Sequence, residues 1–450
     1  MDLTIEKLIY GGDGLARLPA DDKGCGKAVF VPFVLEGEKV TATVTEEKPG
    51  FSRARVEGIV EASPHRIEAR CPYFGRCGGC HYQHSTYEHQ LEVKAAVLAE
   101  NFRRLAKVDL PAELQVHPSP PWEYRNRTRL QVRTRPEFIM GYFRHGSHEV
   151  LPVEQCPISS PLTNRAIRAV WDLGREGLTP AAVREVEFFA NDSQVLVEAS
   201  CTPDLDPCEL AKWGEELRSR FREERGVQSS AGARSEAHPP EMRGLVAFPV
   251  RSAWAAQFPS QRKPIAVVGT GDLIYRTKHA GFRVSAGSFF QVNRFLVDVL
   301  AALVVGGRSG EVALDLFAGV GLFSLALAAS FRHIVAVESS QRSAADLKYI
   351  SPPNVKAVHS TVDEYLATRG AKVRPDLVVV DPPRAGLGER VARALAKMNS
   401  RRLIYVSCDP ATLARDLLHL RAGGYRLEQV HLVDLFPQSY HVESVLHLSR

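Results

Sequence analysis

The stretch EVALDLFAGVGLF, residues 311–323, decides the fold of the C-terminal part of the chain. It begins with an apolar run of the length of a buried strand, and an apolar segment typical of a helix follows Gly319 and Gly321. Glycines in a turn between a strand and a helix let the backbone approach a ligand closely. The stretch therefore predicts a strand, a ligand-binding turn and a helix, in that order.

Buried strands alternate with amphipathic helices from residue 286 to the end of the chain. After the first strand, the expected strands are HIVAVE (333–338), NVKAVHS (354–360), DLVVVD (376–381) and RRLIYVS (401–407), and two more strands follow. Such alternation builds a doubly wound parallel sheet, in which ligands bind beyond the carboxyl ends of the strands. We therefore predict an α/β, Rossmann-like catalytic domain over residues 286–450.

The glycine turn favours a nucleoside cofactor over a dinucleotide. Gly321 is followed by Leu322, and the third glycine of a dinucleotide-binding turn is missing. Glu338 ends the second strand, where an acid suits the hydroxyls of a ribose. Asp363 comes shortly after the third strand, and it either accepts a hydrogen bond from an adenine amino group or caps the next helix.

Two regions of different character precede this domain. Residues 1–62 contain about five short strands separated by glycine and proline turns, which predicts a small barrel of the OB type. Residues 63–285 mix strands and helices, and Ser85-x-x-Glu88 predicts a capping box that opens a helix running to about Leu105. The polar stretch 228–241 has the composition of a flexible surface insertion.

The bulk composition narrows the function only a little. A chain of 450 residues with 44% apolar composition can bury two or three cores, and a formal charge of +5 permits an anionic partner. The first residues lack the apolar core of a signal peptide, and the apolar runs are too short to cross a bilayer. We therefore expect a cytoplasmic protein that contacts no membrane, and no motif indicates an obligate protein partner.

Two residues at the ends of predicted strands are candidates for chemistry. Asp381 and Cys408 follow the fourth and fifth strands, so both should project into the same cleft. Prolines after Asp381 stiffen its turn, and its carboxylate can accept a ring N–H from a planar base. The alternatives are a solvated turn residue for Asp381 and a small buried apolar residue for Cys408. Glu443, on the last strand, is either a base with a raised pKa or an outward residue paired with an arginine.

Three of the eight cysteines, Cys71, Cys77 and Cys80, lie within ten residues on a glycine-rich loop. In a chain without export signals, this favours metal binding over disulfides. Zinc and iron–sulfur sites both need four ligands, and Cys156 is the best fourth candidate because, like Cys71, it precedes a proline. The spacing leaves zinc and a four-iron cluster equally open.

A basic and aromatic segment is the candidate RNA-binding surface. Arg125, Arg127 and Arg129 alternate along one stretch, and Trp122 and Tyr142 lie nearby in the sequence. Cations bind phosphates and aromatic rings stack on unpaired bases. The alternative is a strand whose arginines form ordinary ion pairs.

Five motifs together closely resemble the RNA uracil-5-methyltransferase family. They are Phe289-Phe-Gln291-Val-Asn293, DLFAGVGLF (315–323), Asp381-Pro-Pro-Arg384, Ser407-Cys408-Asp409-Pro410 and His441-Val-Glu443. The N-terminal barrel resembles a TRAM domain, and with the cysteine loop the resemblance covers almost the whole chain. It is greatest to the branch that modifies 23S ribosomal RNA.

The resemblance implies S-adenosylmethionine as the cofactor, RNA as the partner and a [4Fe-4S] cluster on the four cysteines. It implies contacts to the cofactor or the reacting base for Gln291, Phe317, Glu338, Asp363 and Asp381. Phe289 would stack on a flipped uracil, Cys408 would be the nucleophile and Glu443 the proton acceptor. Two departures stand beside it: Leu322 replaces a side-chain amide found in some members, and Asp409 stands where asparagine is frequent.

A thiol is needed because carbon 5 of uracil is a poor nucleophile. A thiolate that adds to carbon 6 makes carbon 5 electron-rich, and a base must later remove the carbon 5 proton. Two alternatives remain. One is a uridine in the T loop of transfer RNA as the substrate, and the other is an inactive iron–sulfur RNA-binding protein in which Cys408 and Glu443 would be idle.

Overall fold

The computed structural model describes residues 1–18, 26–111, 113–223, 240–250, 263–370, 373–398 and 400–450. Most of the polar stretch predicted at 228–241 lies outside the described residues, as does Cys25. None of the helices in the described ranges is both long and apolar enough to span a membrane.

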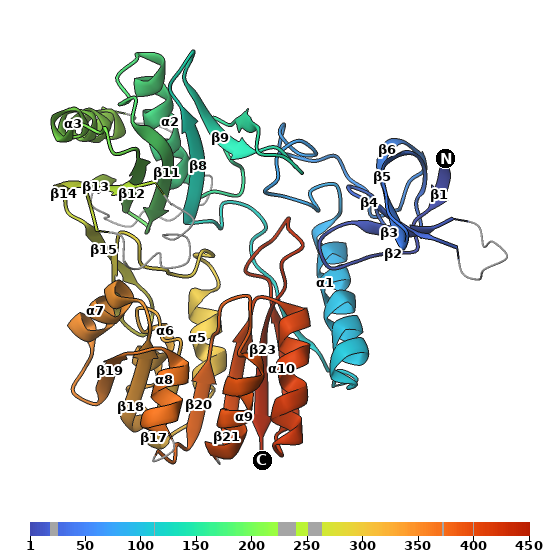
Figure 1. Ribbon diagram of the computed structural model, residues 1–450, viewed down its shortest axis with the longest axis vertical. Coiled ribbons are helices and arrows are strands. Elements are labelled where there is room, and N and C mark those ends of the chain that lie inside the picture. The colour runs from blue at the N-terminus through green and yellow to red at the C-terminus, as the bar shows by residue number, and fades with distance from the viewer. Residues whose placement is uncertain (19–25, 112, 224–239, 251–262, 371–372, 399) are drawn as a thin grey trace.

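The N-terminal residues form a six-stranded sheet in the order β1-β5-β6-β4-β3-β2. Its strands are β1 (Asp2–Thr4), β2 (Lys7–Leu8), β3 (Gly14–Arg17), β4 (Ala28–Val31), β5 (Lys39–Glu47) and β6 (Phe51–Glu61). Strand β1 pairs with β5, and β2, which follows it directly in the chain, pairs with β3 at the other edge of the sheet. The sheet therefore curls on itself around a small apolar core. In Figure 1 this unit stands apart from the two larger sheets.

The helix predicted from Ser85 begins later than expected. Helix α1 (Tyr87–Asn101) has Thr86 as its N-cap and no side-chain cap, and the hydroxyl of the predicted cap Ser85 donates to the Thr86 carbonyl (3.3 Å). The chain continues through a π-helical turn, η1 (Phe102–Ala106), so it ends near the predicted Leu105. Helix α1 runs beside α10 (Pro410–Ala422) and shares a core with the C-terminal sheet (Figure 1).

A seven-stranded sheet occupies the middle of the chain, in the order β10-β9-β8-β11-β12-β13-β14. Its strands are β8 (Arg127–Arg133), β9 (Ile139–Phe143), β10 (Val150–Pro152), β11 (Val183–Ala190), β12 (Gln194–Cys201), β13 (Glu241–Pro249) and β14 (Ala266–Gly269). Helices α2 (Pro161–Arg175) and α3 (Pro207–Glu223) pack on it through Trp171 and Trp213. The hairpin β15 (Asp272–Arg276) and β16 (Gly281–Ser285) and helix α5 (Val297–Val305) lead to the C-terminal sheet.

The C-terminal sheet has the order β19-β18-β17-β20-β21-β23-β22-β7. Five parallel strands follow the predicted alternation: β17 (Gly310–Leu316), β18 (Phe331–Glu338), β19 (Val355–His359), β20 (Leu377–Val380) and β21 (Arg402–Ser407). Its helices are α6 (Leu322–Leu327), α7 (Gln341–Ile350), α8 (Val362–Thr368), α9 (Gly388–Met398) and α10.

The far edge of this sheet departs from a purely parallel one. Strand β23 (Glu443–Ser449) is antiparallel to both β21 and β22 (Arg426–Val433). Strand β7 (Gln115–His117) pairs in parallel with β22, although it comes from the region before the seven-stranded sheet. The middle of the chain therefore contributes a strand to the C-terminal sheet.

A buried ion pair joins α1 to the loop that follows β22. Lys94 Nζ donates to Asp434 Oδ1 at 2.6 Å and to the Phe436 carbonyl at 2.9 Å, and the Tyr87 hydroxyl donates to Asp434 Oδ2. Lys94 and Asp434 are almost fully buried, and burial lowers the pKa of Lys94. The pair fixes this loop, which also lines the candidate site.

Lys94→Met is expected to destabilise the protein by about 3 to 5 kcal/mol, because it leaves a buried carboxylate without its counter-ion. Urea unfolding followed by circular dichroism measures this loss. Lys7→Met is the matched control, since Lys7 pairs with Glu100 of the same helix at the surface and should cost about 1 kcal/mol or less. Equal losses of stability in the two variants would contradict a special stabilising role for the buried pair of Lys94 and Asp434.

Candidate active site

Three predicted residues meet at the ends of neighbouring strands. Asp381 directly follows β20 and Cys408 directly follows β21, which pairs in parallel with β20. Ser407 pairs with Ser444 of the antiparallel strand β23, so Cys408 lies opposite Glu443, the first residue of that strand. The strand order therefore gathers a thiol and two carboxyl groups at one edge of the sheet.

Burial governs the protonation of these groups. It raises the pKa of Cys408 to about 12, nearby Glu443 and Asp381 add to the shift, and Arg384 opposes it. Burial and the neighbouring Asp315 raise the pKa of Asp381 to about 7. Burial and Asp381 hold the pKa of Glu443 well above its usual range. Forming the Cys408 thiolate therefore requires a group that accepts the thiol proton.

The glycine turn after β17 leaves room for a ligand. Phe317, Gly319 and Gly321 all have positive φ angles (66°, 56° and 96°). A Cβ on Gly319 would meet no atom within 4 Å, whereas one on Gly321 would lie 2.4 Å from Leu347 Cδ1. Gly321 is therefore required for packing, and Gly319 faces open space.

Glu338, at the end of β18, is tied into this turn. Its Oε2 accepts a hydrogen bond from the Gly319 amide at 2.8 Å, and its Oε1 accepts from the Ser340 amide at 2.5 Å. Oε2 retains a second lone pair that can accept a hydrogen bond from a ligand hydroxyl, whereas Oε1 also accepts from the Ser339 hydroxyl at 3.5 Å. Glu338 is thus oriented by the backbone beside the open space at Gly319.

Asp363 does not cap its helix. The N-cap of α8 is Thr361, which forms a capping box with Glu364. Asp363 lies in the first turn and accepts from Arg390 Nε of α9 at 2.6 Å. Its carboxylate is therefore held by an ion pair at the surface in this structure.

The segment before α5 presents one aromatic ring and buries the next. Phe289 is 60% exposed, whereas Phe290 is 2% exposed and packs in the core. Gln291 is buried, and its carbonyl accepts from Asn126 Nδ2 at 3.2 Å. The buried neighbours hold Phe289 in place with its ring free to stack on a ligand.

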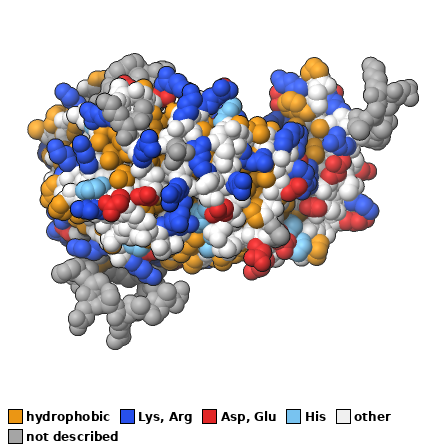
Figure 2. All heavy atoms as spheres, turned by 90° about the horizontal axis from the view of Figure 1, so that it is seen from below, with side chains coloured by type: hydrophobic (Ala, Val, Ile, Leu, Met, Phe, Trp, Pro, Cys, Tyr) orange, Lys and Arg blue, Asp and Glu red, His pale blue; other side chains and the backbone are white. Residues whose placement is uncertain are grey.

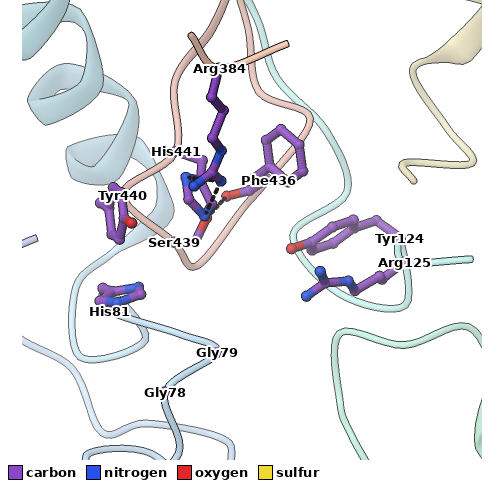
Figure 3. A pocket seen from close by; sticks show the side chains of 10 residues that line it. All are labelled: Gly78, Gly79, His81, Tyr124, Arg125, Arg384, Phe436, Ser439, Tyr440 and His441. Atoms are coloured by element: carbon purple, nitrogen blue, oxygen red, sulfur yellow. Dashed lines mark hydrogen bonds between the residues drawn. The ribbon is translucent and has the colours of Figure 1, made fainter. Parts of the chain in front are cut away.

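A cavity of about 300 Å³ opens next to the reactive groups. It is lined by Gly78, Gly79, His81, Tyr124, Arg125, Arg384, Phe436, Ser439, Tyr440 and His441, as Figure 3 shows. Arg384 Nη2 lies 3.1 Å from the His441 ring nitrogens, and Arg125 faces them across the cavity. Arg384 follows Asp381 by three residues and His441 precedes Glu443 by two, so the cavity adjoins the reactive edge of the sheet.

The other two arginines of the basic segment are engaged inside the protein. Arg127 pairs with Glu187 and Glu198 and donates to the Ser288 carbonyl. Arg129 also pairs with Glu187. Arg127 and Arg129 therefore form ion pairs within the protein, which was the alternative to RNA binding. Of the three arginines, only Arg125 lines the cavity. The partners come from β11 and β12, so the sequence spacing could not reveal them.

The four predicted cysteine ligands lie in one region. Cys71, Cys77 and Cys80 are on the loop between β6 and α1, and Cys156 is in the loop before α2. Burial raises the pKa of Cys77 to about 11 and that of Cys80 further, and charge on Cys156 adds to the shift for both and for Cys71. No three of these sulfurs lie within 4.8 Å of one another in the described part of the chain.

The backbone around these cysteines is held in place by side-chain amides. The Cys156 amide donates to Asn164 Oδ1 and its carbonyl accepts from Asn164 Nδ2, both at 2.9 Å, and the Cys71 amide donates to Gln83 Oε1 at 3.1 Å. All four cysteines are free thiols. A set of four thiols fits a [4Fe-4S] cluster and a zinc ion alike.

Three residues of the site had no assigned role in the sequence analysis. Arg384 and His441 stood in the quoted motifs, but their contact depends on the strand order. Tyr10 comes from the N-terminal sheet, and its hydroxyl donates to Asp409 Oδ2 at 3.0 Å. Asp409 is the N-cap of α10 and follows Cys408 directly, so Tyr10 supports the turn that carries the thiol.

Known proteins are similar to this chain both in parts and over its whole length. The family model described as tRNA (Uracil-5-)-methyltransferase matches residues 369–450, and the TRAM domain model matches residues 1–56. A protein of Aquifex aeolicus described as an uncharacterized RNA methyltransferase is 32% identical over 453 residues, which is 99% of this chain and 97% of the relative. A Streptomyces avermitilis protein with the same description is 32% identical over 473 residues, covering 99% and 96%.

A solved structure has the same fold over the whole chain. It is the Pyrococcus abyssi tRNA (uracil-54, C5)-methyltransferase in complex with S-adenosyl-L-homocysteine. The two chains align over 100% of each, with a TM-score of 0.71 and 21% identity.

Proposed function

This chain belongs to the RNA uracil-5-methyltransferase family, and we propose that it methylates carbon 5 of a specific uridine in 23S ribosomal RNA with S-adenosylmethionine as the methyl donor. The observation that carries the proposal is the position of Cys408 opposite Glu443 at the end of β21, beside Asp381. A thiol and two carboxyl groups are what attack on a pyrimidine ring and later proton removal require.

Cys408 acts as the nucleophile. Its thiolate forms a bond from Sγ to carbon 6 of uracil, and the ring electrons move to carbon 5 and the carbon 4 oxygen. S-adenosylmethionine supplies the methyl group as an electrophile. Glu443 then takes the proton from carbon 5, and the electron pair left behind reforms the ring double bond and expels Cys408 as a thiolate. Asp381 accepts a hydrogen bond from the ring N–H and holds the base in position.

Residues at the glycine turn would hold the cofactor. The open space at Gly319 and the backbone-oriented carboxylate of Glu338 fit a nucleoside with a ribose diol. Phe317, Gly321 and Gln291 border the same region in the proposal, and Asp363 would have to leave Arg390 to reach an adenine.

The target base must leave its stack to reach Cys408. Phe289 supplies an exposed ring on which the uracil can stack. Arg125 and Arg384 line the adjoining cavity and would neutralise the phosphates that flank the flipped nucleotide. Arg127 and Arg129 would act by holding the strand through Glu187 rather than by touching RNA.

Net charge does not identify the RNA-binding face. Lys and Arg side chains are spread over the face seen in Figure 2, and Asp and Glu side chains lie among them. The proposed RNA-binding surface is therefore assigned from the cavity and from the N-terminal sheet, because OB-like barrels commonly bind nucleic acid.

The four cysteines would hold a [4Fe-4S] cluster with a structural role. The chemistry above moves a methyl group and a proton but no electron, so it requires no redox centre. The cysteine loop contributes Gly78, Gly79 and His81 to the cavity, and a cluster would fix that wall. In the proposal the cluster shapes the RNA-binding surface.

Transfer RNA is the second candidate substrate, favoured by the Pyrococcus abyssi neighbour, whose description names uracil-54 of tRNA. Initial rates with a 23S ribosomal RNA fragment library and with unmodified transfer RNA separate the two. The proposal expects transfer to a 23S fragment at a kcat/KM at least tenfold above that with any transfer RNA. The reverse ratio would replace ribosomal with transfer RNA, and binding without transfer to either would favour the inactive RNA-binding protein.

Arg384 should set the pH at which the enzyme works. Its charge lowers the pKa of Cys408, so Arg384→Met raises that pKa further and leaves less thiolate at neutral pH. Each unit of pKa corresponds to about a tenfold lower thiolate fraction. We expect the methyl-transfer rate to rise from pH 7 to pH 9 in the unmodified protein.

The Arg384→Met profile should be displaced to higher pH, with about a tenfold loss at both pH 7 and pH 9, because both lie well below the pKa of Cys408. Single-turnover rates across this range measure the displacement. Arg393→Met, an exposed arginine paired with Glu389 on α9, is the control and should leave the profile unchanged. An unchanged single-turnover rate at saturating RNA for Arg384→Met would show that Arg384 acts through binding alone.

A further inference from the structure

Two histidines and a glutamate meet at the start of α1, away from the candidate active site. One donor atom from each of His65, His89 and Glu92 lies within 4.8 Å of the other two. The His65 and His89 rings stack at a centroid distance of 4.2 Å with 4° between their planes. His89 and Glu92 are one helical turn apart, with His89 Nδ1 3.2 Å from Glu92 Oε2.

The hydrogen bonding of His89 is incomplete. His89 is 8% exposed, and its Nε2 has no hydrogen-bond partner among the residues that the structure describes. A proton on Nδ1 leaves a bare lone pair on Nε2, and a proton on Nε2 turns the Nδ1 lone pair toward the Glu92 carboxylate. Either neutral tautomer leaves Nε2 without a partner, as a bare lone pair or as an N–H without an acceptor, which is rare for buried polar groups. A cation bound at Nε2 removes that deficit, and a cation bound at Nδ1 removes the conflict between the Nδ1 lone pair and the Glu92 carboxylate.

We propose that His65, His89 and Glu92 form a binding site for one zinc ion. Two imidazoles and one carboxylate are an established zinc donor set, with water in the fourth position. Donor atoms in a zinc tetrahedron are about 3.3 Å apart, as follows from bonds of about 2.0 Å. The donor atoms must therefore approach by about 1.5 Å at most, and the exposed Glu92 can supply much of that movement by rotation. The His65 ring must also turn out of its parallel stack with His89, because a zinc ion lies in the plane of each imidazole that binds it.

The zinc ion would join the two ends of the cysteine loop. Arg66 and Ser85 form an isolated β-bridge, the Thr86 amide donates to the His65 carbonyl at 2.9 Å, and the Ile67 amide donates to the His84 carbonyl at 2.9 Å. His65 therefore precedes the loop, and His89 and Glu92 follow it. Arg66 also pairs with Glu38 of the N-terminal sheet, so the same clasp would fix that sheet to α1.

Zinc titration by calorimetry tests the site in the full-length protein with its cysteine site loaded. We expect one equivalent of zinc to bind to the unmodified protein, and at least tenfold weaker binding to Glu92→Gln and to His65→Asn. Glu92 is exposed, so Glu92→Gln should fold normally, and its unfolding midpoint in EDTA should equal that of the unmodified protein. His279→Ala, an exposed histidine before β16, is the control and should bind zinc as the unmodified protein does.

Cobalt(II) in place of zinc identifies the donor atoms. Nitrogen and oxygen ligands give d–d bands without a thiolate-to-cobalt charge-transfer band, so the proposal expects none for the equivalent that Glu92→Gln loses. A thiolate band for that equivalent would assign the ion to the cysteines and overturn the proposal. Equal zinc affinity in the unmodified protein and both variants, or no binding to any of them, would also overturn it.

Discussion

Glu443→Gln is expected to turn the protein into a trap for its own substrate. Cys408 can still add to carbon 6 and carbon 5 can still be methylated, but no group removes the carbon 5 proton, so the thiol cannot leave. A covalent protein–RNA complex should therefore accumulate and survive a denaturing gel. Turnover should fall about 10²- to 10⁴-fold, the usual contribution of a general base.

The substitution should leave the fold intact. Burial raises the pKa of Glu443 and so disfavours its charged form, and glutamine is neutral and has nearly the same shape. The double variant Cys408→Ala with Glu443→Gln is the control and should form no adduct. An adduct in the double variant would assign the bond to another residue, and a fully active Glu443→Gln protein would assign proton removal to another base.

The proposed [4Fe-4S] cluster predicts that Cys80→Ser loses iron and acid-labile sulfide and has lower thermal stability. Cys80 is buried against Tyr124 and Ile158, so the loss of the cluster opens the wall that carries Gly78 and Gly79. Because about 1 kcal/mol shifts the unfolding midpoint of a domain of 150 to 250 residues by about 2 to 4 °C, the loss of a structural cluster should lower it by about 5 °C or more.

Metal analysis and calorimetric scanning of anaerobically purified protein measure these effects. Cys208→Ser is the matched control, since Cys208 is an exposed free thiol on α3 and should leave iron content and midpoint unchanged. Zinc in place of iron in the unmodified protein would replace the four-iron cluster with a zinc site. Iron retained by Cys80→Ser would remove Cys80 from the ligand set.

The parallel part of the C-terminal sheet could be predicted because its signals are local. Strands β17, β18, β20 and β21 each contain an apolar run, and each strand from β17 to β21 is followed by a helix. That alternation sends Asp381 and Cys408 to the same edge. The antiparallel placement of β23 between β21 and β22 has no local signal, although it brings Glu443 opposite Cys408.

Contacts between segments far apart in the chain could not be predicted from the sequence. The prediction of Ser85 as the N-cap was wrong: its hydroxyl donates to the neighbouring Thr86 carbonyl, and Thr86 is the N-cap residue. Arg127 and Arg129 were expected at an RNA surface, but Glu187 lies beside them on the neighbouring strand β11. The same limit applies to Tyr10, whose partner Asp409 is 399 residues away.

Nucleoside mass spectrometry tests the central claim most directly. Purified protein is incubated with methyl-labelled S-adenosylmethionine and unmodified RNA, the RNA is digested to nucleosides, and Cys408→Ala is run in parallel. The account predicts label in 5-methyluridine from 23S ribosomal RNA and none with Cys408→Ala. Label in any other nucleoside, or an equal yield of 5-methyluridine with Cys408→Ala, would contradict it.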